Sequence, residues 1–110
     1  MVNQIDARKR FLSGYLEAEK RLHLKRQKAA ESVEIPMIEA ETAQLVQRRA
    51  EVLAVIESAP EPIMRTILEA RYINGMKWEA IGDLTGYCCE NAFKIHQKAI
   101  RQMTFPASVG

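Results

Sequence analysis

The clearest structural pattern in this chain lies in residues 77–103, which read KWEAIGDLTGYCCENAFKIHQKAIRQM. Apolar residues recur at three-residue steps over residues 77–84, which is typical of one face of a short helix. Gly86 permits the positive φ of a tight turn, and the residues from about Cys88 to Met103 again follow a helical period. Two helices joined by a short turn that contains glycine predict a helix-turn-helix.

The helix predicted from Cys88 to Met103 has two opposite faces. One face suits a core, and the other suits the major groove of DNA, which is wide enough to accept a helix. A solvated surface helix or a plain helical bundle would show the same pattern, so these alternatives stay open. The apolar stripe comprises Ala92, Ile95, Ala99 and Met103. The polar strip comprises Glu90, Lys94, Gln97 and Arg101, with Asn91 and Lys98 at its flanks.

In a DNA complex the polar side chains of this helix would divide by chemistry. Gln97 and Asn91 suit adenine, and Glu90 suits the amino group of cytosine. Lys77 would contact the DNA backbone from the preceding helix. The basic side chains that would contact phosphates or base edges are Lys94, Lys98 and Arg101.

A third short helix is expected before this pair, over residues 63–73, and it ends at Asn74-Gly75. Trp78 is the only tryptophan, and we expect it at the centre of the core formed by the three helices. His96 is expected to be a packing residue rather than a ligand or a catalyst. The side chains expected around Trp78 are Ile67, Ile81 and Ile95.

Two longer helices are predicted upstream, from about Asn3 to Glu31 and from about Pro36 to Ser58. The second helix carries an apolar seam at coiled-coil spacing, which predicts an antiparallel hairpin within one chain or pairing between two chains as a homodimer. The seam comprises Ile38, Leu45, Val52 and Ile56.

Ala59-Pro-Glu-Pro62 marks the clearest boundary, because each proline disfavours helical geometry in the residue before it. The predicted fold class is therefore all-α in three parts. Residues 1–59 form a helical hairpin or coiled coil, residues 60–104 form the three-helix unit, and residues 105–110 form a frayed tail.

Charge is unevenly distributed over the 110 residues, although the formal net charge is only +2. Residues 1–30 contain eight lysines and arginines against three acids, whereas residues 31–61 contain two against seven. This pattern favours two solvated helix faces that attract each other, or a basic arm that contacts phosphate.

Several function classes receive no support from the sequence. No apolar run approaches the roughly 18 residues of a membrane span, and the N-terminus lacks the order of a secretory signal, so we expect a cytoplasmic protein. Cys88 and Cys89 are adjacent, which disfavours a disulfide between them, and with His23 and His96 they complete no familiar zinc site. No catalytic constellation and no cofactor motif occurs, so an enzyme is not expected.

Short motifs within residues 62–103 resemble a known family by their order. They are Ile67-Leu-Glu-Ala-Arg-Tyr-Ile73, Gly75-Met-Lys-Trp-Glu-Ala-Ile-Gly82, Leu84, Gly86-Tyr87, Ile95-His96 and Lys98-Ala-Ile-Arg101. Together they resemble region 4, the promoter-recognition domain of bacterial sigma factors, and more closely the small phage-encoded regulators of that superfamily.

The resemblance implies that groove contacts come from the start of the last helix. Residues at the matching positions are Cys89, Glu90, Phe93 and Lys94. Cys89 and Phe93 replace basic or polar residues of the family pattern, and Cys88 stands where a serine or threonine cap is usual. The docking mode is therefore expected to persist while the DNA sequence that is recognised changes.

The predicted function is a sequence-specific, DNA-binding transcription regulator of phage or prophage type. Double-stranded DNA is its expected partner, with RNA polymerase as a further one. The alternative is a phage packaging or assembly adaptor, or another helical protein-interaction module. The modest charge of the last helix keeps that alternative open.

Overall fold

In the computed structural model, which describes residues 4–29 and 35–109, every regular element is helical. No strand occurs in these residues, which confirms the all-α prediction. None of the described helices is long and apolar enough to cross a membrane. The elements are α1 (Gln4–Ala29), α2 (Ile35–Glu57), α3 (Pro62–Tyr72), α4 (Trp78–Thr85), α5 (Cys89–Gln102) and the 3-10 helix η1 (Ala107–Val109).

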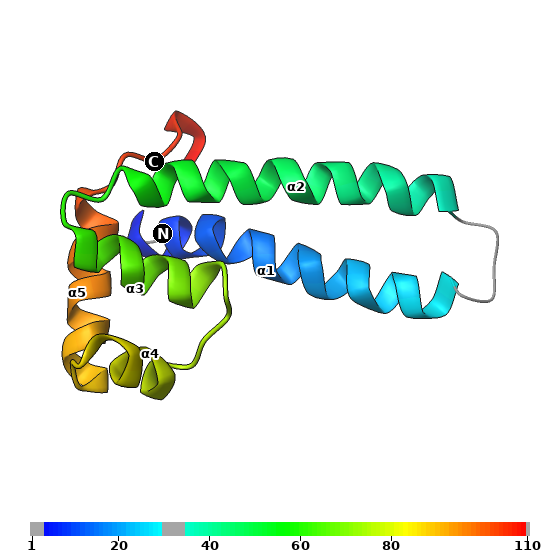
Figure 1. The fold of residues 1–110 in the computed structure, drawn as a ribbon. Helices are drawn as coiled ribbons and strands as arrows, with labels where there is room; N and C mark the ends of the chain where they lie inside the picture. Colours follow the sequence, from blue (N-terminus) through cyan, green and yellow to red (C-terminus); the bar gives the residue numbers. More distant parts are fainter. Residues whose placement is uncertain (1–3, 30–34, 110) are drawn as a thin grey trace.

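The two long helices lie side by side and run antiparallel, with the shorter helices gathered where α1 begins and α2 ends (Figure 1). Val52 and Ile56 of α2 are buried in one cluster with Leu12 of α1, and Leu45 is half-buried against that cluster. The side chain of Ile38 lies outside the described residues. The described part of the apolar seam is therefore covered within one chain and is not free to pair with a second copy.

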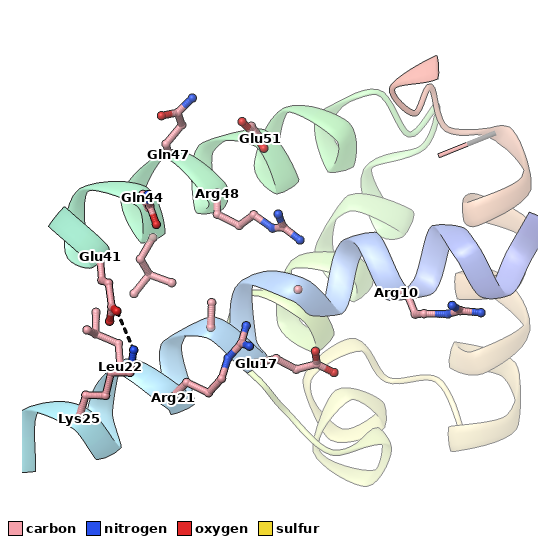
Figure 2. A pocket seen from close by; sticks show the side chains of 13 residues that line it. Arg10, Glu17, Arg21, Leu22, Lys25, Glu41, Gln44, Gln47, Arg48 and Glu51 are labelled. Carbon is pink, nitrogen blue, oxygen red and sulfur yellow. Dashed lines mark hydrogen bonds and ion pairs between the residues drawn. The ribbon is translucent and has the colours of Figure 1, made fainter. Parts of the chain in front are cut away.

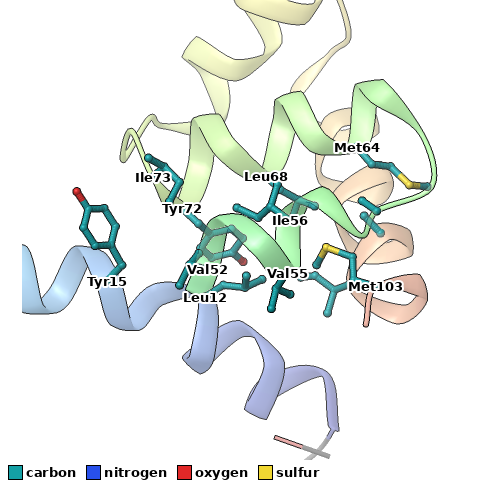
Figure 3. Packing of buried hydrophobic residues seen from close by; sticks show 13 residues of the cluster. Leu12, Tyr15, Val52, Val55, Ile56, Met64, Leu68, Tyr72, Ile73 and Met103 are labelled. Atoms are coloured by element: carbon teal, nitrogen blue, oxygen red, sulfur yellow. The ribbon is translucent and has the colours of Figure 1, made fainter. Parts of the chain in front are cut away.

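One hydrophobic core joins the base of the two long helices to α3 and α5 (Figure 3). Leu12, Val52, Leu68 and Ile100 come from four different helices, and each is 0% exposed. Ala59, at the predicted domain boundary, is itself buried in this core. Full burial of an aliphatic side chain contributes about 1.5 to 3 kcal/mol. The shared core therefore couples the stability of the two segments that the sequence separates.

A second, smaller cluster lies between α3, α4 and α5 and holds the buried side chains of Ile67, Ala70, Ile81 and Ala92. Trp78 and Ile95 pack against it, as the sequence predicts, but Trp78 is only half-buried. The expectation that Trp78 forms the centre of the core is wrong. Trp78 is the first residue of α4, so its indole lies at the edge of the cluster and Ile81, one turn later, is fully buried.

The segment after α5 differs from the frayed tail expected over residues 105–110. The Phe105 ring meets Phe11 of α1 edge-on at 6.0 Å, and the Arg8 guanidinium lies 4.8 Å from the Phe105 centroid. The backbone N–H of Thr104 donates to Ser58 Oγ at 3.0 Å. Phe105 is therefore packed against α1, whereas Pro106, Ala107 and Ser108 after it are exposed.

Candidate nucleic-acid interface

The turn between α4 and α5 sets the orientation of α5. Gly86 adopts φ 79°, and its N–H donates to the Gly82 carbonyl at 2.9 Å, which closes α4. A Cβ on Gly82 would stand 2.8 Å from the Tyr87 carbonyl oxygen, so only glycine allows the turn to fold back on α4. The sequence pattern predicts the role of Gly86 and gives no reason for Gly82.

The N-terminus of α5 has no side-chain cap. Cys88 occupies the N-cap position with extended geometry (φ −69°, ψ 159°) and makes no capping hydrogen bond through its side chain. Glu90 lies in the first turn, where its charge complements the positive end of the helix dipole. The amide donors of this first turn therefore receive no hydrogen bond from the Cys88 side chain.

The two faces of α5 are divided as its period predicts, with Ala92, His96, Ala99 and Ile100 buried. Gln97 departs from its expected place, because it is half-buried and its Oε1 is buried with no hydrogen-bond partner among the described residues. Every other residue predicted to contact DNA is exposed: Lys77, Cys89, Glu90, Asn91, Phe93, Lys94, Lys98 and Arg101.

Phe93 lies beside the polar strip, in a cluster of aromatic rings. It meets Trp78 edge-on at 5.3 Å and is tilted against His96 at 5.4 Å. Lys9 of α1 places its ammonium 5.1 Å from the Phe93 centroid, and Arg71 of α3 lies 5.0 Å from the Trp78 centroid. These contacts join three other helices to the first half of α5.

His96 and Tyr72 form a buried polar pair beneath this cluster. The Tyr72 hydroxyl and His96 Nε2 are 2.6 Å apart, and the two rings are stacked at 5.5 Å. Burial, together with a smaller contribution from the nearby Lys9 cation, lowers the pKa of His96 to about 4. Burial also raises the pKa of Tyr72 to about 12. Both groups are neutral near pH 7, which supports the packing role expected for His96.

The C-terminal end of α5 is fastened by an arginine that sequence reasoning missed. Arg8 Nη1 donates to the carbonyl of Ile100 at 2.7 Å and to that of Arg101 at 3.2 Å. The last carbonyls of a helix have no hydrogen-bond donor within the helix, and here the Arg8 side chain is that donor. The basic bias of residues 1–30 was the signal, but it could not indicate which cation reaches α5 across 92 positions.

Two hollows adjoin the aromatic cluster. One is an almost wholly apolar hollow of about 340 Å³, lined by Trp78, Cys89, Glu90, Phe93 and Lys94 at the start of α5. The other, of about 450 Å³, lies between α1 and α3 and brings together Lys9, Lys20 and Arg71 beside Glu17. Trp78 and Phe93 line both hollows.

A third hollow, the largest of these three, lies away from α5, between α1 and α2 (Figure 2). It measures about 720 Å³ and is lined mostly by charged side chains, among them Arg21, Arg48 and Glu51. Among the described residues, no three histidine, cysteine or acidic side chains gather as a metal site.

In comparisons with protein-family models, curated proteins and solved structures, nothing matches this chain.

Proposed function

We propose that this protein is a sequence-specific, DNA-binding transcription regulator that lays α5 in the major groove. One observation supports the proposal above the others. The helix α5 is held by buried side chains on one face and presents Lys94, Lys98 and Arg101 to solvent on the other. A rigid helix with one free basic face has the shape and charge that groove binding requires.

The exposed side chains of α5 would contact different parts of the DNA. Asn91 suits the adenine edge and Glu90 suits the cytosine amino group. Gln97 would act through its Nε2 donor alone, because its Oε1 is buried. Lys77, exposed at the N-cap of α4, would contact the backbone beside the groove. The phosphate contacts would come from Lys94, Lys98 and Arg101.

On this proposal α4, the Gly86 turn and α5 form a helix-turn-helix, and α1 with α2 forms a hairpin that supports it. The resemblance to sigma-factor region 4 and to phage-encoded regulators supports a cytoplasmic role in transcription, with RNA polymerase as a further partner. A homodimer would lengthen the recognised site. It would need an outer surface of the hairpin, because the described part of the α2 seam is already covered by α1.

The test is a pair of charge reversals, Lys94→Glu with Lys98→Glu. Duplex binding, measured by fluorescence anisotropy over a salt series, should be lost at moderate salt while the helical content stays unchanged. The matched control, Arg21→Glu with Arg26→Glu, makes the same charge change towards the far end of α1 and should bind nearly as well. Unchanged binding by the Lys94/Lys98 variant would show that α5 is not the DNA-reading helix.

A protein-interaction adaptor is the second candidate. The hollow between α1 and α2 favours it, together with Leu24 and Val46, which are 57% and 65% exposed on these two helices. An adaptor would show no retention on duplex DNA at any salt concentration. A DNA-binding regulator is retained at low salt and released as salt rises, because bound phosphates release their counterions.

A further inference from the structure

We propose that the start of α5 recognises the 5-methyl group of thymine through the apolar hollow lined by Trp78, Cys89 and Phe93, here named the Phe93 notch. This inference rests on the proposed DNA-binding function, and it names the base feature that the notch selects.

The Phe93 notch differs from the surface around it. Its lining is almost entirely apolar, although Glu90 and Lys94 complete it. Phe93 is 37% exposed and Cys89 is exposed beside it in the first turns of α5. An apolar recess on an otherwise charged helix face gains stability when an apolar group fills it.

The Phe93 ring is packed against three neighbouring side chains. The ring centroids of Trp78 and His96 lie 5.3 and 5.4 Å from that of Phe93, and the Lys9 ammonium lies 5.1 Å from the Phe93 centroid. A ring held by three neighbours loses little further rotamer freedom on binding, so a contact made there costs little entropy. The notch is in this sense prepared for a small apolar group.

The chemistry of the major groove identifies that group. The hydrogen-bonding edges of the four bases need donors or acceptors, which phenylalanine lacks and cysteine supplies only weakly. The 5-methyl group of thymine is the apolar feature that a base pair presents in this groove. The first turns of a recognition helix are the part that meets base edges. At Cys89 and Phe93, contact with the 5-methyl group of thymine therefore takes the place of hydrogen bonds to the bases.

The experiment begins with selection of preferred duplexes from a random-sequence pool by the full chain. Each thymine of the selected site is then replaced singly by deoxyuridine, which removes one methyl group and leaves every hydrogen-bonding group unchanged. Affinity should fall about fourfold at one or two positions, the ratio expected from losing one buried methyl group. The other thymines should show no difference between the two bases.

Variants of the chain locate the effect. Phe93→Ala should bring the thymine-to-uracil affinity ratio at the sensitive position close to one. Cys89→Ser, an exposed change outside the core, should lower the ratio even where Phe93→Ala weakens the fold. Tyr87→Ala removes an exposed aromatic ring that does not line the notch, and it should leave the ratio unchanged.

The outcomes separate this inference from the proposed function. If the chain selects no duplex, both the proposed DNA-binding function and the recognition of the thymine methyl group are wrong. A chain that selects a site where no thymine is sensitive to methyl loss, or where the sensitivity survives both Phe93→Ala and Cys89→Ser, retains its DNA-binding function. In that case methyl readout by the Phe93 notch is wrong.

Discussion

At the base of the two long helices, Leu12, Val52 and Ile56 are buried in a core shared with α3 and α5. Towards the far end, within residues 17–27 and 39–45, Leu22 alone is buried. There the helices meet through polar contacts between Lys25 and Glu41 and between Arg26 and Thr42. Buried packing at the base of the two long helices therefore contributes more to stability than the contacts at the far end. The far end is expected to open first.

This difference bears on function because α5 is attached to the base. Arg8, Leu12 and Phe105 connect α5 and the segment after it to the first three turns of α1. The proposed DNA-reading helix is thus held by the most stable part of the molecule. None of the contacts that hold α5 comes from the far end of the two long helices, within residues 17–27 and 39–45.

The largest expected effect comes from truncating one leucine at each end. Leu12→Ala should destabilise the protein by about 2 to 5 kcal/mol, because it leaves a cavity in a core formed by four helices. Leu22→Ala, at the far end, should cost near the lower limit of that range, because few buried neighbours surround it and the site can collapse. Urea unfolding followed by circular dichroism measures both values. Equal losses would show that the two ends form one cooperative core.

Sequence periodicity predicted most of the local structure. The helix expected over residues 36–58 is found as Ile35–Glu57, and the glycine turn is found at Gly86. The burial of Ala92, Ala99 and Met103 was also predicted. These features depend on helical period, on proline, and on the φ angle that glycine permits, which are all local signals.

Features that depend on how α1 crosses α5 could not be predicted from the sequence. The contacts of Arg8 with the α5 carbonyls, of Lys9 with Phe93 and of Phe105 with Phe11 join residues more than 80 positions apart. The half-burial of Gln97 and the edge position of Trp78 were likewise set by tertiary packing. Helical period indicates which face is apolar, but it does not indicate which neighbour covers that face.

The second prediction concerns the pH dependence of folding stability, which involves His96 of α5. Because burial lowers the pKa of His96 from 6.5 to about 4, the unfolded chain takes up a proton first as pH falls. Stability should therefore decline from about pH 6.5 to about pH 4, by about 3 kcal/mol from this residue, and no further below that.

Matched variants isolate the contribution of His96 from that of the carboxyl groups, which also titrate in acid. Urea unfolding at several pH values should show a weaker pH dependence for His96→Gln than for the parent chain. His23→Gln removes the exposed histidine of α1 and should keep the parent profile. If His96→Gln keeps that profile as well, the histidine is not held neutral by burial.

The smallest effect is expected at the far end, from removing the charge of one carboxyl group with Glu41→Gln. The Lys25 Nζ and Glu41 Oε1 atoms are 2.6 Å apart, but their side chains are 57% and 31% exposed. Solvent and salt weaken such a pair, so the loss of global stability should be about 0.2 to 1 kcal/mol and should vanish at high salt. Amide hydrogen exchange should quicken in the last turns of α1 and remain unchanged around Val52 and Ile56.

Glu39→Gln, which neutralises an exposed carboxyl group on α2, the helix of Glu41, serves as the control. If exchange quickens equally at both ends after Glu41→Gln, the two ends open together, and the polar far end is part of the same cooperative unit as the base.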